Sequence, residues 1–283
     1  MRRVFRILGY VALAFVALLV VAYGVVYAIS ESRVRRAYAL TRETVALPTD
    51  SASLAEGKRF AQIRGCTGCH GALAQGDTFV DSWLLARVVS PNLTQAARTY
   101  STDDLVRIVR HGLRPDGKSV VVMPSGMFTA LTDQDLGAIL AYLKSLPVSE
   151  GPGREVRLGP AARLMFTLGK FLPAAQEADS AARLASIYPT TTDSNWQGAY
   201  LARTACTECH GLDLRGDASG TPPDLKIAGA YPLDAFVRLM RTGVPVSGLE
   251  LGLMKEVSLR RFSYFTDGEI ASLHAYLVAR ARQ

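Results

Sequence analysis

The chain has 283 residues, with 32 Lys and Arg against 25 Asp and Glu, a formal net charge of +7 and four cysteines. This length allows one large or two small domains in addition to a membrane segment. The positive charge does not indicate nucleic-acid binding, because six basic residues flank one apolar segment, the others are dispersed among acidic residues, and no basic run is interleaved with aromatic residues.

The N-terminal segment predicts a membrane helix. Three arginines precede an uncharged apolar stretch of 23 residues, Ile7 to Ile29. As a helix this stretch is about 34 Å long, enough to cross a bilayer. The alternative is a removed secretory signal, but such a signal has a shorter apolar region and a small-residue cleavage site, which the residues after Tyr27 resemble poorly. We therefore expect an uncleaved transmembrane anchor at residues 1–30 and a tether at residues 31–50.

The pattern Cys-x-x-Cys-His occurs twice and contains all four cysteines: Cys66, Cys69 and His70 form the first pentad, and Cys206, Cys209 and His210 the second. This pattern is the attachment signature of c-type haem. Cysteines three residues apart lie on one side of a helical turn, so that each sulfur can form a thioether with a haem vinyl group while the histidine binds the iron. A thioredoxin-like pair needs no such histidine, and a zinc site needs four ligands where each pentad offers three. We expect two covalently bound haem c groups.

An internal repeat follows the pentads, which are 140 residues apart. Pro91, in a Pro-x-Leu segment, recurs as Pro223; residues 103–112 recur as 234–243; and residues 132–143 recur as 266–277. The offsets range from 131 to 140 residues, which indicates loops of different length. A period as long as a whole domain indicates tandem duplication rather than a solenoid. We expect a first domain at residues 51–147, a linker at 148–194 and a second domain at 195–283.

Each copy has helical signals and no alternating strand pattern longer than a few residues. Polar residues at 51–53 and 193–195 are expected to cap a first helix that runs into the pentad. The middle helix should end at Gly112 or Gly243, and the last helix should begin at Thr132 or Thr266. We expect each small helical domain to depend on its haem to fill the interior.

These motifs resemble those of class I cytochromes c over roughly residues 55–147 and 195–280, and the whole chain is similar to membrane-anchored dihaem cytochromes c. The resemblance implies an all-α fold, with one N-terminal transmembrane helix plus two tandem cytochrome c-like domains. It also implies that the pentad histidine is the proximal iron ligand and that the carbonyl of Pro91 or Pro223 orients it. A methionine before the last helix would be the distal ligand.

The family's first helix crosses its last helix, and the matching residues here are Gly57 and Phe60 in the first copy, Gly198 and Tyr200 in the second, with the crossings near Tyr142 and Tyr276.

The methionines supply one candidate distal ligand in each copy. Met123, which precedes a proline, matches the family's distal position better than Met127 does. In the second copy the corresponding window contains one methionine, Met254. Met240 aligns with Val109 and is expected in the core of the middle helix. Thioether ligation suits iron that stays six-coordinate in both oxidation states.

The remaining histidines and several arginines are expected to be structural. His111 aligns with Thr242, so we interpret it as a surface or haem-edge residue, and His274 as a residue of the last helix. Arginines at 107 and 110 recur at 238 and 241; a solvated helix face is the default interpretation, and pairing with haem propionates is the alternative. In the linker, residues 161–172 can form a short amphipathic helix that packs against a haem domain or, less favourably, lies on the bilayer.

The sequence therefore predicts a periplasmic, membrane-tethered relay that passes single electrons between redox proteins through two His/Met haems. Because c-type haem is attached on the periplasmic side of the bacterial inner membrane, both pentads should lie there, on a single-pass protein. An oxidase, a dehydrogenase or other cytochromes are the expected partners. The alternatives are a dihaem peroxidase with one open haem, and a cytochrome subunit of a terminal oxidase or periplasmic dehydrogenase.

Overall fold

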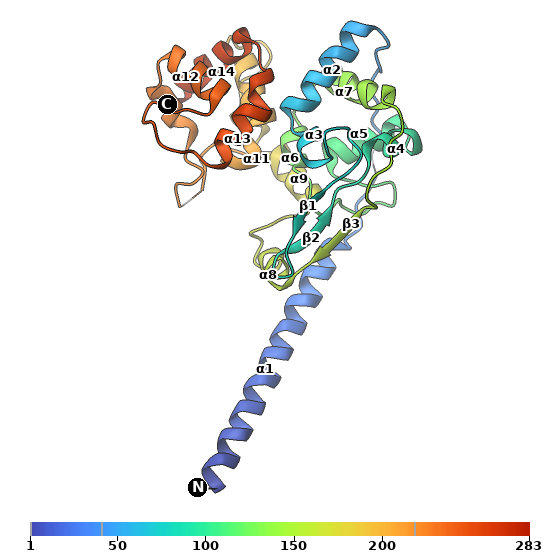
Figure 1. Ribbon diagram of the computed structural model, residues 1–283, viewed down its shortest axis with the longest axis vertical. Helices are drawn as coiled ribbons and strands as arrows, with labels where there is room; N and C mark the ends of the chain where they lie inside the picture. Colours follow the sequence, from blue (N-terminus) through green and yellow to red (C-terminus); the bar gives the residue numbers. More distant parts are fainter. Residues whose placement is uncertain (1, 41, 218) are drawn as a thin grey trace.

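A computed structural model describes residues 2–40, 42–217 and 219–283 of the chain. Figure 1 shows a long N-terminal helix projecting from a body in which two helical units lie side by side, with a small sheet between the first unit and the projecting helix. We call residues 51–147 unit 1 and residues 195–283 unit 2.

The helices are α1 (Arg2–Val34), α2 (Ser51–Ile63), α3 (Cys66–Cys69), α4 (Leu93–Thr99), α5 (Thr102–His111), α6 (Ser125–Phe128), α7 (Asp133–Ser145), α8 (Pro160–Thr167), α9 (Ala174–Arg183), α10 (Trp196–Ala205), α11 (Thr207–His210), α12 (Leu233–Thr242), α13 (Leu253–Arg260) and α14 (Asp267–Ala281). Short 3₁₀ turns are η1 (Ala185–Ile187), η2 (Leu225–Ala230) and η3 (Phe262–Tyr264), and the strands are β1 (Thr78–Asp81), β2 (Ala86–Val89) and β3 (Glu155–Leu158).

Helix α1 is the one helix in the described part of the chain that is long and apolar enough to cross a membrane. Its most apolar window has a mean hydropathy of 2.5, and none of that window is buried against the rest of the protein. The helix continues past the predicted anchor boundary at residue 30 as far as Val34. The most apolar part of α1 therefore has no cover within the described residues.

Each unit is built on a close crossing of its first and last helices. In unit 1, a Cβ added to Gly57 of α2 would lie 2.0 Å from the carbonyl oxygen of Ala138 in α7. In unit 2, a Cβ added to Gly198 of α10 would lie 2.0 Å from the carbonyl oxygen of Ser272 in α14. Real Cβ atoms do not approach backbone oxygens this closely, so both crossings require glycine. The crossings expected near Tyr142 and Tyr276 are present.

The helix termini follow the predicted caps of the middle and last helices, but the first helices differ. Asp50, which precedes the predicted residues 51–53, caps α2, and Asn195 makes no side-chain capping hydrogen bond at the start of α10. Ser101 and Thr266 form capping boxes at the starts of α5 and α14, and Gly112 and Gly243 end α5 and α12 in the left-handed conformation, with φ of 61° and 70°. The first helix of unit 1, however, does not run into the pentad. It ends at Ile63, and Gly65, with φ of 76°, turns the chain into the separate short helix α3. The left-handed residue breaks the helix because it cannot continue the α-helical hydrogen-bond ladder.

The three strands form an antiparallel sheet in the order β1-β2-β3, which the all-α prediction missed. Strand β2 pairs along its length with β3, with Val88 opposite Val156. Each strand has only four residues, and β3 comes from the linker, far from β2 in sequence. Short strands that pair at long range leave little periodicity in the sequence. The fold is thus mostly helical with a small added sheet.

The linker is a structured part of the body. Helix α9 packs against α5 and α6, and a Cβ on Gly112 would lie 2.5 Å from the Cβ of Ala174. Helix α8 packs against the end of α1, and its start is also held by unit 1, where the Ala161 N–H donates to the Leu84 carbonyl at 3.0 Å. The tether is also fixed to unit 1, where the Tyr38 backbone N–H donates to the Gly117 carbonyl at 2.9 Å.

We predict that Gly198→Ala destabilises unit 2 by about 3 kcal/mol, because the added methyl group forces α10 and α14 apart. The matched control is Gly268→Ala in α14, where a Cβ would meet no atom within 4 Å and alanine improves helix propensity. Thermal unfolding followed by circular dichroism should show a lowered Tm for the first variant and an unchanged or raised Tm for the second. Equal Tm values for the two variants would contradict the close crossing.

Candidate haem centres

The first pentad lies on a short helix whose geometry is set by the loop that follows. The His70 N–H donates to the Cys66 carbonyl at 2.9 Å, which keeps the first cysteine and the histidine within one helical turn. The His70 carbonyl in turn accepts from the Gly76 N–H at 2.8 Å. Gly76 has a φ of 87°, and a Cβ there would lie 2.7 Å from the Ser90 carbonyl oxygen. This tight loop brings the segment at Pro91 beside the histidine.

The second pentad repeats this loop closely. The His210 N–H donates to the Cys206 carbonyl at 2.9 Å, and the Gly216 N–H donates to the His210 carbonyl at 2.8 Å. Equivalent positions have left-handed backbone in both copies: Gly71 and Gly211, Gly76 and Gly216, and the non-glycine pair Ala74 and Leu214. The glycine pairs share the 140-residue offset of the pentads. That offset was the signal by which sequence reasoning could have found them.

Both pentad histidines are oriented by a proline carbonyl. His70 Nδ1 lies 2.8 Å from the Pro91 oxygen, and His210 Nδ1 lies 2.9 Å from the Pro223 oxygen. A carbonyl can only accept, so Nδ1 carries the hydrogen and Nε2 has a free lone pair. Burial lowers the pKa of both histidines, while the carbonyl hydrogen bonds oppose the shift. Each ring is therefore held neutral, in the tautomer that presents Nε2 to a metal.

The four thiols are unpaired and do not have the environment of reactive cysteines. Burial raises the pKa of Cys66 to about 11 and that of Cys206 to about 12, whereas a redox-active thiol needs a lowered pKa. Within the described residues, no three His, Cys, Asp or Glu side chains converge as a metal site would require. Cys66 and Cys69 are half-buried, Cys206 is buried and Cys209 is exposed. Neutral thiols beside a histidine with a free Nε2 fit the covalent attachment of haem c.

The predicted distal methionines, Met123 and Met254, are less buried than Met127 and Met240. Met123 and Met254 are half-buried, and each packs against the edge of the core of its own unit. Met127 is fully buried in α6, and Met240 is 2% exposed on α12, as expected for core residues. Met254 lies in the first turn of α13 rather than in an extended loop. Only Met123 and Met254 thus combine the predicted position with partial exposure.

The surface between the units brings the two pentads together, which the sequence did not reveal. Arg261, from the end of α13, donates through Nε to the Ile63 carbonyl at 3.0 Å, three residues before Cys66. Its Nη1 donates to Glu208 Oε2 at 2.7 Å, and Glu208 lies between the two cysteines of the second pentad. A Cβ on Gly65 would lie 2.9 Å from the Arg261 guanidinium carbon. One side chain therefore contacts both pentad segments.

A second arginine is buried in the same surface. The Arg64 side chain is fully buried, donates to Thr204 Oγ1 at 3.1 Å, and lies over the rings of Phe60 and Tyr200. Tyr200 donates to Asp135, which lies 3.7 Å from Arg64 Nη2. Arg64 Nε and Nη1 and Arg261 Nη2 are buried without a hydrogen-bond partner among the described residues. The positive charges of both arginines oppose the rise in the pKa of both Cys66 and Cys206.

The other predicted residues have structural contacts. His111 Nε2 lies 2.6 Å from Glu43 of the tether, and His274 Nε2 lies 2.8 Å from the Tyr231 carbonyl. The solvated-face interpretation of the recurring arginines is wrong for the first copy, where Arg107 and Arg110 are buried. Arg110 donates to the Leu131 carbonyl and to Asp133 at the start of the last helix, and Arg241 makes the same contacts with Ser263 and Asp267. These arginines tie the middle helix to the last one.

Comparison with known proteins agrees with this geometry. Residues 54–147 match the cytochrome c family model. The cytochrome c subunit of the quinone-type alcohol dehydrogenase of Gluconacetobacter polyoxogenes is 25% identical over 272 residues, covering 81% of this chain and 56% of that protein. The fructose dehydrogenase cytochrome subunit of Gluconobacter japonicus is 22% identical, covering 80% of this chain and 52% of that protein. The chain therefore spans about half the length of these relatives.

A half-buried carboxyl beside the surface between the units provides a pH-dependent test. A Cβ on Gly126 of α6 would lie 2.9 Å from the Glu177 side chain and 3.1 Å from that of Leu212, so Glu177 lies close to residues of both units. Burial, and secondarily the charge of Glu208, raises the pKa of Glu177 to about 7 from its ordinary value of 4.5. The folded protein therefore binds this proton more tightly than the unfolded chain does.

The stability that this proton contributes is present below about pH 4.5 and is lost as the pH rises through 7. We predict that Glu177→Gln becomes more stable than the native protein by about 1–2 kcal/mol between pH 5 and pH 8, with allowance for solvent screening. The difference in Tm between the two proteins, measured across this range, should grow with pH. The exposed control Glu150→Gln should show no such trend, and a flat difference for Glu177→Gln would contradict the half-buried carboxyl.

Proposed function

We propose that this chain, whose residues 54–147 form a cytochrome c domain, is a membrane-tethered electron carrier with two haem c groups, one on each pentad. A cytochrome c domain binds haem c covalently, which accounts for Cys66, Cys69 and His70. The second group is supported by the geometry around His210, where the loop, the left-handed residues and the proline carbonyl repeat those of the first pentad. The two units would then be tandem cytochrome c domains, at residues 51–147 and 195–283, joined by the linker at 148–194.

Haem c, when bound, supplies a single-electron couple between ferrous and ferric iron. The roles of the chain's own residues follow from their contacts. Cys66, Cys69, Cys206 and Cys209 would hold the porphyrin edges through thioethers. His70 and His210 would bind iron through Nε2, and the carbonyls of Pro91 and Pro223 hold the Nδ1 hydrogen, which fixes the ring orientation and makes Nε2 more basic.

Met123 and Met254 would complete the coordination on the opposite side. Because both side chains are only partly buried at the edge of a core, their thioether groups could reach the iron without disrupting the packing. Met127 and Met240 are buried within the cores. A thioether ligand favours ferrous iron and keeps the coordination sphere full in both oxidation states. A protein with both sites filled transfers electrons and has no open position for substrate chemistry.

The observation that carries the relay function is the contact of Arg261 with both pentad segments. Through Ile63 on one side and Glu208 on the other, this side chain holds the two attachment sites at one shared surface. Electron transfer between two centres depends on their proximity and on a fixed packing between them. The buried Arg64 and the Tyr200–Asp135 contact add rigidity there. The arrangement favours passage of electrons from one site to the other within the chain.

Two further features concern partners and location. The relatives are named as cytochrome subunits of dehydrogenases, which favours a dehydrogenase as the partner that donates electrons, and favours a subunit of a dehydrogenase over a subunit of a terminal oxidase. Helix α1 would anchor the chain in the inner membrane, with both units in the periplasm. The packing of α8 on the end of α1 supports retention of that helix, because cleavage near residue 30 would remove one side of this contact.

We predict two covalent haems per chain. Denatured protein should keep its haem through acid–acetone extraction and give a pyridine haemochrome of two per polypeptide. Replacement of Cys206 and Cys209 by Ala should reduce this value to one, as should replacement of Cys66 and Cys69. One haem per polypeptide in the native protein would show that it is a single-haem carrier.

We predict that both irons are low-spin with His/Met ligation, and that each methionine contributes about half of the far-red thioether charge-transfer band. Met123→His and Met254→His should each remove one half and lower one midpoint potential, because imidazole stabilises ferric iron more than thioether does. Met127→Leu is the control and should leave the band intact.

The peroxidase alternative gives the opposite result in the same protein. A high-spin iron in the resting state, with ready binding of carbon monoxide and consumption of peroxide, would exclude the relay.

A further inference from the structure

The linker helix α8 is hydrogen-bonded to the C-terminal end of α1. Arg163 Nη1 donates to Ser30 Oγ at 3.0 Å and to Glu31 Oε2 at 2.9 Å, and Thr167 Oγ1 donates to the Val26 carbonyl at 3.2 Å. Phe166 is 1% exposed beneath this contact. Since the apolar stretch of α1 ends at Ile29, α8 lies at the level of its last turn and the first polar residues beyond it. This is the level at which a spanning helix leaves the hydrocarbon layer.

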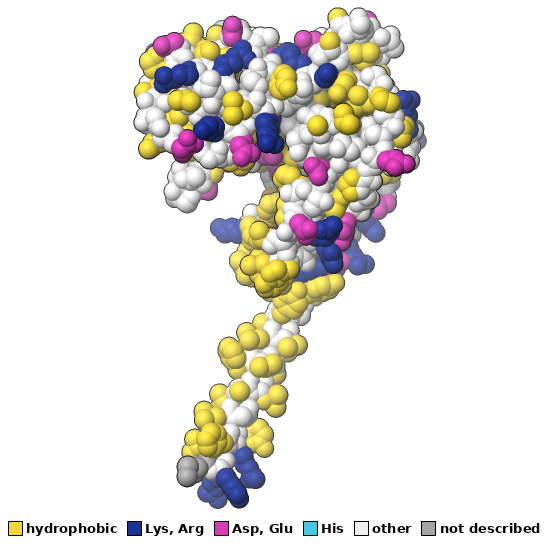
Figure 2. Space-filling view, viewed as in Figure 1, with side chains coloured by type: hydrophobic (Ala, Val, Ile, Leu, Met, Phe, Trp, Pro, Cys, Tyr) yellow, Lys and Arg dark blue, Asp and Glu magenta, His cyan; other side chains and the backbone are white. Residues whose placement is uncertain are grey.

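A set of exposed apolar side chains surrounds this contact. The tip of the β1–β2 hairpin is fixed to the start of α8, where the Gly159 N–H donates to the Leu85 carbonyl at 2.7 Å and the Ala161 N–H to the Leu84 carbonyl at 3.0 Å. We define the apolar ridge as the exposed residues of this tip and of α8 with the turn after it: Trp83, Leu84, Leu85, Leu164, Met165, Leu168 and Phe171. Trp83 is 83% exposed and Leu168 64%. Figure 2 shows hydrophobic side chains gathered at this base, next to the apolar surface of α1.

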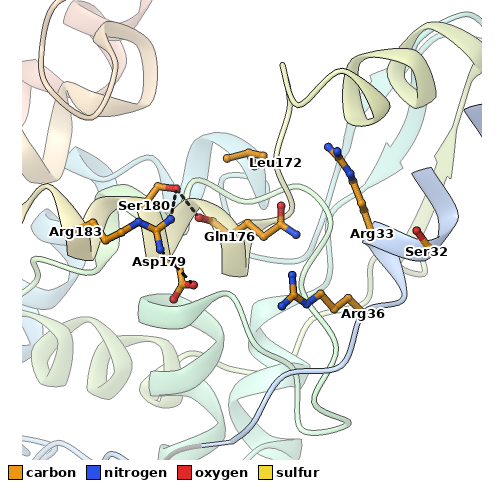
Figure 3. Close-up of a pocket in the computed structure, with 8 residues that line it drawn as sticks. All are labelled: Ser32, Arg33, Arg36, Leu172, Gln176, Asp179, Ser180 and Arg183. Atoms are coloured by element: carbon orange, nitrogen blue, oxygen red, sulfur yellow. Dashed lines mark hydrogen bonds and ion pairs between the residues drawn. The ribbon is translucent and has the colours of Figure 1, made fainter. Parts of the chain in front are cut away.

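A basic pocket opens beside the ridge, at residues that follow the apolar stretch of α1. Figure 3 shows it between α9, which contributes Gln176, Asp179, Ser180 and Arg183, and the end of α1 with the segment after it, which contribute Arg33 and Arg36. The pocket has a volume of about 620 Å³ and is also lined by Ser32 and Leu172. Its three guanidinium groups face one carboxylate, that of Asp179, which lies 3.8 Å from Arg183.

The arginines of this pocket are only partly engaged by the protein. Arg33 donates to the Phe166 carbonyl, and Arg183 donates to Ser180 Oγ at 3.3 Å. Arg36 has no carboxylate within ion-pair distance in the part of the chain that the structure describes; its guanidinium lies over the ring of Tyr38. Guanidinium groups bind phosphate oxygens in a bidentate way, and serine hydroxyls and the glutamine amide can donate further hydrogen bonds.

The depth of the pocket matches the headgroup layer of a membrane. Arg33 lies four residues beyond Ile29, a rise of about 6 Å along a helix. The polar layer on each side of a bilayer's hydrocarbon core is about 5–7 Å thick. Interfacial tryptophans belong at the boundary between these layers, and anionic lipids attract basic residues just outside it.

We propose that the base of the molecule is a lipid-contact site, in which the apolar ridge enters the membrane interface and the pocket binds the phosphate of an anionic phospholipid. The site rests on the proposed role of α1 as an anchor, and it extends that role. It fixes the two units at a set height above the bilayer instead of leaving them on a free tether.

The ridge is tested in the full-length protein reconstituted in lipid nanodiscs. A spin label is placed at Leu168→Cys, and in a second protein at Leu249→Cys, a leucine of unit 2 with a matching exposure of 68%. We expect the label at residue 168 to be several-fold more accessible to oxygen, relative to a water-soluble nickel reagent, than the label at residue 249. Equal ratios at the two positions would overturn the proposal, as would protection of residue 168 from both reagents, which would show that a protein covers the ridge.

The pocket is tested by native mass spectrometry of detergent-solubilised protein titrated with phosphatidylglycerol, phosphatidylcholine or inorganic phosphate. We expect preferential retention of phosphatidylglycerol, weakened about tenfold or more by Arg36→Gln combined with Arg183→Gln. The charge-matched control, Arg215→Gln combined with Arg282→Gln, removes two exposed arginines of unit 2 and should retain the lipid. Equal loss in both proteins would mean unspecific charge attraction, and equally tight binding of inorganic phosphate would mean a soluble anion site; either result overturns the proposal.

Carbonate extraction of native membranes separates failure of this proposal from failure of the anchor. Protein released into the soluble fraction shows that α1 does not anchor the chain. Protein that remains with the membranes, but shows equal accessibility at residues 168 and 249, overturns the lipid-contact site alone.

Discussion

The close crossing of the first and last helices is the constraint on which each candidate haem centre depends. At Gly57 and Gly198 the backbone of one helix touches the backbone of the other, so that no side chain fits between them. The crossing fixes the direction of the first helix, and the pentad follows that helix after a few residues. The loop after the pentad then folds back through left-handed glycines and brings a proline carbonyl to the histidine Nδ1. An uncharged, oriented imidazole is the result in both units.

The surface between the units contains charged groups whose burial is energetically unfavourable. Arg64 is fully enclosed, and three of the nitrogen atoms of Arg64 and Arg261 lack hydrogen-bond partners among the described residues. Buried cationic groups without full pairing are unfavourable, and the half-buried Glu177 is unfavourable when ionised. Both arginines lie between the two pentad segments, where they hold the units in a fixed packing.

The linker and the tether pack against unit 1 and α1, so that the parts of the molecule are held in one arrangement. Helix α9 fills the space beneath α5 and α6, the tether residue Glu43 pairs with Arg110 and His111, and α8 docks on α1. The sheet, which takes its third strand from the linker, extends from unit 1 toward the end of α1 (Figure 1). Each of these contacts restricts how the two units stand relative to α1. In the proposed carrier, this fixed arrangement would give the units a defined orientation toward their partners.

The sequence by itself determined the local features: the apolar length of α1, the two pentads, the capping residues of the middle and last helices, and the glycines of the helix crossings. These depend on residues a few positions apart, where spacing translates directly into helical geometry. Tertiary structure decided what depends on distant segments. It broke the first helix at Gly65, paired β2 with a strand from the linker, buried Arg107 and Arg110, and placed α8 between the end of α1 and the turn that joins β1 and β2. The contact of Arg261 with both pentads joins residues about 200 positions apart in sequence, and no local pattern records a pairing that exists only because two units pack against each other.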